Sequence, residues 1–109
     1  MTIRVNHVER KHQLRRMSAT VYKMADGAEV LKSYDTIVAM KLPDGTFAFS
    51  SYWTSKDGSI TTKRHISTWS GTPIKAIRDG IKEHWYRTWE DVNKGYLRAI
   101  EVAIRSCID

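Results

Sequence analysis

The stretch Thr36-Ile-Val-Ala-Met-Lys-Leu-Pro-Asp-Gly-Thr-Phe-Ala-Phe49 decides the fold class, because it places β-type segments on both sides of one turn. Proline presets φ and glycine supplies a positive φ, so Pro43-Asp44-Gly45 predicts a tight turn. Apolar residues mostly alternate after Thr36, and they alternate again from Thr46 to Trp53. Alternation of this kind is typical of half-buried strands. The stretch therefore predicts an antiparallel hairpin with its turn at 43–45.

Further strands are expected on both sides of this hairpin. β-branched and aromatic residues from Ala19 to Met24 predict a strand that ends at the turn-forming pair Asp26-Gly27. Lys56-Asp57-Gly58-Ser59 predicts a second hairpin turn, and the Thr-rich segment Ile60 to Trp69 predicts the next strand. We therefore expect a three- to four-stranded antiparallel meander.

The period of the apolar residues changes to a helical one after Gly71. Thr72-Pro73 is typical of a helix start, because a capping hydroxyl precedes a proline at the first helical position. One apolar stripe follows at helical spacing, formed by Ile74, Ile77, Ile81 and Trp85. A second, longer helix is expected to begin at a Thr88 cap, with Asp91 three residues on. The chain is thus expected to form one α+β domain over residues 1–109, with two C-terminal helices packed on one sheet face.

Basic residues are concentrated at the start of the chain. Eighteen Lys and Arg residues against twelve Asp and Glu residues give a net charge of +6, and residues 1–24 hold six basic residues and one acidic residue. Residues 3–8 suggest a short strand and residues 9–16 a helical turn or an ordered arm, so residues 1–17 are expected to be a basic N-terminal arm or edge element. Such a segment favours contact with nucleic-acid phosphates. The alternative is a solvated face that keeps the protein soluble.

The sequence lacks the patterns of several functional classes. No apolar run approaches the roughly 20 residues of a membrane-spanning helix, and the N-terminus lacks the apolar core of a signal peptide, so we expect no membrane partner and a cytoplasmic location. The single Cys107 excludes an internal disulfide. The four histidines match no metal-ligand spacing, and no phosphate-binding loop or nucleophile motif occurs. We expect no metal, no cofactor and no enzymatic activity.

The segment Ser59 to Ile66 is the most suggestive for binding. On a strand, Lys63 and His65 would share one face beside Tyr52 of the neighbouring strand, with Arg64 on the other face. Basic and aromatic side chains on an open sheet face suit single-stranded nucleic acid. The alternative is a hairpin whose threonines only serve the sheet.

The tryptophans near the helix junction offer a second surface. Trp85, Tyr86 and Trp89 cannot all face one helical stripe, so one ring is expected to be exposed as a protein anchor or a nucleobase platform. Alternatively, these rings fill the gap between helices and sheet. The candidate binding residues are Arg4, Arg10, Lys11, Arg15, Arg16, Tyr52, Lys63, Arg64, His65 and Trp89.

The segments Ser33-Tyr34-Asp35-Thr36-Ile37-Val38-Ala39 and Thr61-Thr62-Lys63-Arg64-His65, with Tyr52 between them, carry a resemblance. They resemble a family of small bacteriophage and mobile-element proteins with an S-Y-x-T-x-V-A segment and a later T-T-x-[RK]-H segment. The resemblance covers roughly residues 33–66 and brings no known activity with it. It implies a phage accessory protein in the bacterial cytoplasm, engaged in host takeover, counter-defence such as anti-CRISPR activity, or nucleic-acid management. The shared polar residues could stabilise a hairpin or form a binding surface.

Two hypotheses of function follow. In the first, the protein is a non-enzymatic inhibitor that binds a host or defence protein, such as a CRISPR effector, through its basic arm or aromatic junction. In the second, it is a nucleic-acid-binding accessory protein that contacts phosphates without reading sequence. The excess of positive charge disfavours DNA mimicry. The long C-terminal helix could also support a homodimer.

Overall fold

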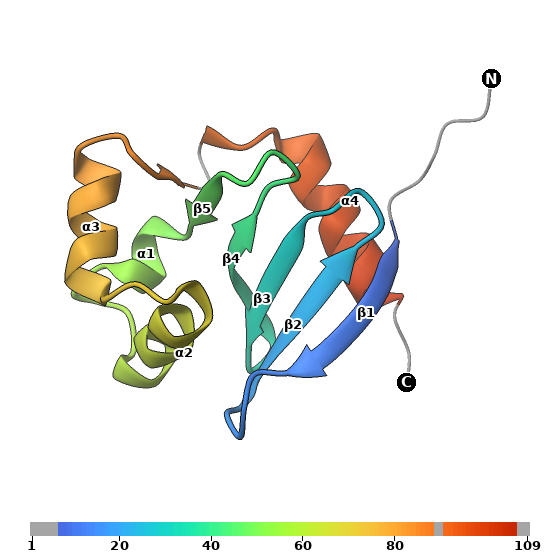
Figure 1. Ribbon diagram of the computed structural model, residues 1–109, viewed down its shortest axis with the longest axis horizontal. Coiled ribbons are helices and arrows are strands. Elements are labelled where there is room, and N and C mark those ends of the chain that lie inside the picture. The colour runs from blue at the N-terminus through green and yellow to red at the C-terminus, as the bar shows by residue number, and fades with distance from the viewer. Residues whose placement is uncertain (1–6, 89–90, 107–109) are drawn as a thin grey trace.

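The computed structural model describes residues 7–88 and 91–106 of the chain as an α+β fold around one mixed sheet (Figure 1). The strands lie side by side in chain order: β1 (Val8–Gln13), β2 (Ala19–Met24), β3 (Glu29–Ser33), β4 (Thr36–Lys41), β5 (Phe47–Phe49) and β6 (Arg87–Thr88). The helices are α1 (Ser51–Thr54), α2 (Ile60–Ser70), α3 (Ile74–Lys82) and α4 (Lys94–Arg105). Pairing is antiparallel from β1 to β5 and parallel between β5 and β6. The described sheet therefore has six strands, more than the three or four expected.

Helices cover both faces of the sheet, so the prediction of two helices on one face is wrong (Figure 1). Leu31 and Phe49 pack with Ile66 of α2 and Ile77 of α3 in one buried cluster. The strand residues that point the opposite way form a second cluster with α4, made of Tyr22, Met24, Val30, Met40, Ala48, Ile100 and Ile104. Since side chains alternate along a strand, a sheet with apolar residues at successive positions needs a cover on each face.

The strand expected from Ile60 to Trp69 is instead helix α2. The Ser59 side chain accepts a hydrogen bond from the Thr62 amide at 3.1 Å, and Gly71 ends the helix in the left-handed conformation. Thr62, His65 and Ile66 are buried together because their spacing of three and four residues places them on one helix face. The segment before it leads into a helix, so the predicted hairpin at 56–59 is also wrong.

The β4–β5 hairpin confirms the turn at Pro43-Asp44-Gly45, with Leu42 N donating to Thr46 O at 2.8 Å. The strand after this turn is shorter than expected: β5 ends at Phe49, and the Ser50 side chain caps the short helix α1. The expected strand Ala19–Met24 is confirmed as β2.

The basic N-terminal segment contributes the edge strand β1, which agrees with the edge element given as one alternative for residues 1–17. Residues 9–13 lie in this strand and do not form the helical turn that was the alternative for residues 9–16. A bulge lies between Val8 and Arg10. Arg4 lies outside the described residues.

Two helices follow Gly71, as predicted, and the second begins later in the sequence than expected. α3 begins after Pro73, close to the predicted position. α4 begins at Lys94, where the Asn93 side chain accepts a hydrogen bond from the Tyr96 amide at 3.1 Å. The predicted cap Thr88 belongs to β6 instead, although its amide does donate to the Asp91 carboxylate at 3.3 Å. None of the helices in the described ranges is long and apolar enough to cross a membrane.

Candidate functional site

The outermost hairpin of the sheet, residues 8–24, gathers the basic side chains and is called the basic hairpin below. Its cations are Arg10, Lys11, Arg15, Arg16 and Lys23, against the single carboxylate of Glu9. Four of these five side chains are exposed, and Lys11 is half-buried. Arg10 on β1 and Lys23 on β2 are directly opposed in the antiparallel register, so both project from the same face of the sheet. The basic hairpin ends in β1, the outermost described strand of the sheet (Figure 1), so positive charge is concentrated at that edge.

The turn of the basic hairpin holds two adjacent arginines in a fixed loop. Leu14 N donates to Ala19 O at 2.8 Å, and Met17 N donates to Leu14 O at 3.0 Å. The buried Leu14 anchors the loop in the core, while Arg15 and Arg16 are exposed. Arg15 has a positive φ of 53°, an uncommon conformation for a residue with a side chain.

Tyr34 lies beside this turn, at the same end of the sheet. Its amide donates to Ser18 O at 2.9 Å, which joins the β3–β4 turn to the β1–β2 turn. Tyr34 has a φ of 52°, and its side chain is 57% exposed. Its ring centroid lies 5.6 Å from that of His65 on α2, with the two planes tilted by 49°.

His65 is fixed by a buried polar network between β3 and α2. Ser33 Oγ lies 2.8 Å from His65 Nδ1 and 3.2 Å from Thr62 Oγ1. Ser33 and His65 are each 2% exposed and Thr62 is 3% exposed. Burial lowers the pKa of His65, and the positive charge of Arg64 lowers it further, so the neutral imidazole is favoured. The network locks the imidazole ring in place beneath Tyr34.

A serine hydroxyl beside a histidine also occurs in nucleophilic catalysis. Here the hydroxyl is enclosed between β3 and α2 and bonds to a second buried side chain, Thr62. Its surroundings suit anchoring of the helix to the sheet rather than approach of a substrate.

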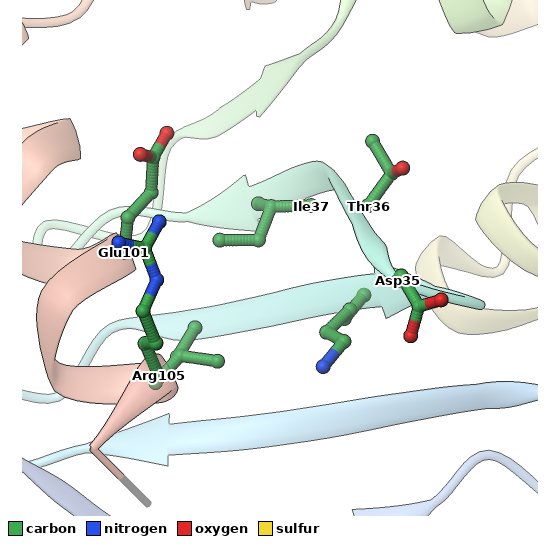
Figure 2. A pocket seen from close by; sticks show the side chains of 7 residues that line it. Asp35, Thr36, Ile37, Glu101 and Arg105 are labelled. Atoms are coloured by element: carbon green, nitrogen blue, oxygen red, sulfur yellow. The ribbon is translucent and has the colours of Figure 1, made fainter.

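A separate pocket of about 340 Å³ lies on the face of the sheet that α4 covers, opposite the face that α2 covers. It lies between α4 and the β3–β4 turn (Figure 2). It is lined by Lys32, Asp35, Thr36, Ile37, Glu101, Ile104 and Arg105. Figure 2 shows Glu101 and Arg105 on α4, with their side chains close to each other, and Ile37 on the neighbouring strand. Two cations and two carboxylates give this lining a balanced charge, so it does not select strongly for an anion or a cation.

The structure separates the sequence-predicted site residues into three groups. Arg10, Lys11, Arg15 and Arg16 come together in the basic hairpin. On α2, Lys63 is half-buried, Arg64 is exposed and His65 is buried, so the predicted sheet face shared by Lys63, His65 and Tyr52 does not form.

Tyr52 is exposed on α1, with its ring 5.0 Å from that of Trp53. Trp89 lies outside the described residues. Sequence reasoning missed Ser33, Tyr34 and Thr62 as contact partners of His65, although the quoted resemblance contains all four positions. The four positions are up to 32 residues apart in the sequence, and only the helical form of α2 brings them together.

Among residues 7–88 and 91–106, no group of three or more His, Cys, Asp or Glu side chains is placed to hold a metal ion. Comparison with curated proteins and with solved structures finds no match to this chain. Residues 5–90 match the model of a family of unknown function, DUF8033. The match spans most of the chain and includes the basic hairpin, Tyr34 and the whole of α2. The protein therefore belongs to the DUF8033 family.

Proposed function

We propose that this protein is a non-enzymatic accessory protein that binds nucleic acid through phosphate contacts made by the basic hairpin, without reading base sequence. The observation that carries the proposal is the arrangement of Arg10, Arg15, Arg16 and Lys23, four exposed cations on one edge hairpin. Cations clustered in this way displace counterions from a phosphate backbone, which is the main source of sequence-independent affinity. Backbone pairing of β1 with β2 and of β2 with β3 holds the hairpin, so these charges are presented together rather than on a loose chain.

Salt dependence of binding tests this proposal. Each phosphate neutralised contributes roughly −0.9 to the slope of log K against log salt on duplex DNA, so four contacts give a slope of about −3.6. Replacing Arg15 and Arg16 by glutamine should reduce that slope by about 1.8. The matched control is Lys75→Gln with Lys82→Gln, which removes the same charge from exposed positions of α3 and should leave the slope unchanged. Equal effects of the two double variants would contradict a specific role of the hairpin.

The second candidate function is inhibition of a host or defence protein by surface binding, as expected of a phage accessory protein. The observation that favours it is Trp85, which is 77% exposed in the segment after α3 and next to His84, which has a φ of 63°. Exposed tryptophan is a frequent anchor at protein–protein interfaces. A pull-down from bacterial lysate with the native protein and with Trp85→Ser tests this function. A specific partner that the variant fails to capture would support it, and identical sets of captured proteins would contradict it.

A further inference from the structure

We infer that Tyr34 is a base-stacking platform, so that the basic hairpin binds single-stranded nucleic acid in preference to duplex. This inference rests on the proposed phosphate binding and names the class of nucleic acid that the same end of the molecule accepts. It is carried by the juxtaposition of one exposed, rigidly held aromatic ring with the arginine-bearing turn.

The ring of Tyr34 is presented to solvent from an unfavourable backbone position. Tyr34 and Asp35 form the two-residue turn of the β3–β4 hairpin, since Ser33 and Thr36 are paired on either side. Tyr34 occupies the first turn position with a φ of 52°, where glycine is the usual residue. A tyrosine at this position places its ring outside the sheet, with 57% of the side chain exposed.

The ring is also supported from below. His65 packs against it at 5.6 Å, and the imidazole is itself fixed by Ser33 Oγ at 2.8 Å from Nδ1. A fixed aromatic surface loses little conformational entropy when a ligand stacks on it. The buried hydrogen bonds among Ser33, Thr62 and His65 therefore hold His65 against the exposed ring of Tyr34, and they do not form a separate site.

Cations occur on the two elements that adjoin Tyr34, the β1–β2 turn and α2. The hydrogen bond from Tyr34 N to Ser18 O ties the backbone of Tyr34 to the turn that carries Arg15 and Arg16. On α2, Arg64 is exposed next to His65, the residue that packs against Tyr34, and its charge acts on that imidazole. Asp35, the neighbouring carboxylate, lines the pocket on the opposite face of the sheet (Figure 2).

This combination selects for unpaired bases. An aromatic side chain can stack only on a free base face, and in a duplex both faces of each base are already stacked. Aromatic platforms combined with basic grooves are the usual means of binding single strands without sequence preference. The arrangement at Tyr34 therefore fits a single strand whose phosphates lie along the arginines and whose base covers the ring.

The test compares binding of the full chain to an oligothymidine strand and to a duplex of equal length, by fluorescence anisotropy at low salt. The native protein should bind the single strand more tightly than the duplex. Tyr34→Leu should weaken single-strand binding roughly 5- to 150-fold, the effect of losing one stacked base, and leave duplex binding unchanged. Tyr34→Phe should retain the native affinity. The control is Val102→Ala, which changes an exposed apolar side chain on α4, away from the Tyr34 turn. This variant should bind as the native protein does.

The outcomes separate the two claims. Failure of the native protein to bind either nucleic acid at any salt concentration would overturn the phosphate proposal and this inference with it. Equal binding of both nucleic acids, or full single-strand binding by Tyr34→Leu, would overturn the inference alone. Photocrosslinking of the native protein to a strand containing iodouracil gives a measurement that does not depend on folding of a variant. An adduct at Tyr34 supports the platform, and adducts confined to other residues contradict it.

Discussion

Replacing Ser33 by alanine should cost more stability than any exposed serine, because it removes the hydroxyl that links α2 to the sheet. Ser33 Oγ lies 2.8 Å from His65 Nδ1 and 3.2 Å from Thr62 Oγ1, and all three side chains are buried. A buried polar atom without a partner costs roughly 1–3 kcal/mol. We expect the free energy of unfolding to fall by about 2–3 kcal/mol.

Urea unfolding followed by circular dichroism measures this change. The slope of the free energy of unfolding against urea concentration should be the same for the variant and the native protein, which shows that the two-state comparison is valid. At about 4 °C per kcal/mol for a domain of this size, the melting temperature should fall by roughly 8–12 °C. Ser18→Ala is the matched control, since Ser18 is exposed and only its carbonyl is engaged by Tyr34, and it should change stability by less than about 0.5 kcal/mol. A loss below about 1 kcal/mol for Ser33→Ala would refute the account of the network as an anchor.

The same network makes a prediction about pH. Burial lowers the pKa of His65 from its ordinary value of 6.5, so between the two values the unfolded chain binds a proton that the folded chain does not. The stabilisation is complete above pH 6.5 and is lost as the pH falls through the lowered pKa. The native protein should therefore lose stability as the pH falls below 6.5, and His65→Gln should lose less over the same range. Parallel curves for the two proteins would assign the acid sensitivity to other groups.

Two further predictions concern packing and α4. Gly58→Ala should lower the free energy of unfolding by about 2 kcal/mol or more, because a β-carbon there would overlap the backbone carbonyl of Trp53. At Gly71 a β-carbon meets only open space, and the φ of 73° is the only obstacle, so Gly71→Ala should cost about 1 kcal/mol in the same urea assay. The reverse order would contradict the close approach at Gly58. Tyr96→Phe removes a 2.6 Å hydrogen bond to Asp26 and should cost about 1 kcal/mol near neutral pH. Burial and that bond raise the pKa of Tyr96, so native stability is lost above about pH 10, and the variant should show a smaller alkaline loss. An equal alkaline loss would show that other tyrosines are responsible.

Local signals predicted the elements that local chemistry determines. The turn at Pro43-Asp44-Gly45 and the strand Ala19–Met24 follow from proline, glycine and β-branched residues acting over a few positions. The helix after Pro73 follows in the same way from its capping pattern and apolar stripe.

Residues 60–70 show where such reasoning stops. Threonine and isoleucine favour strands by propensity, yet Thr62, His65 and Ile66 become one buried helix face once β3 and β4 supply the surface beneath them. The cap residues Ser59 and Gly71 were visible in the sequence, but the Gly58-Ser59 pair is equally typical of a turn. Tertiary contact decided between two locally acceptable conformations.

The candidate site was predictable only in part, for the same reason. The charge of the basic hairpin follows from composition, because surface cations need no particular neighbour. The support of Tyr34 by His65 depends on two segments that are far apart in the chain and on the helical form of one of them. No periodicity within either segment carries that information.

The parallel pairing of β5 with β6 has a consequence for biosynthesis. Phe47, Ala48 and Phe49 leave the ribosome long before Arg87 and Thr88, which complete the sheet beside them. Until then the nascent chain exposes an apolar strand edge, and such edges recruit other chains. Messages truncated between these two strands should thus yield insoluble product.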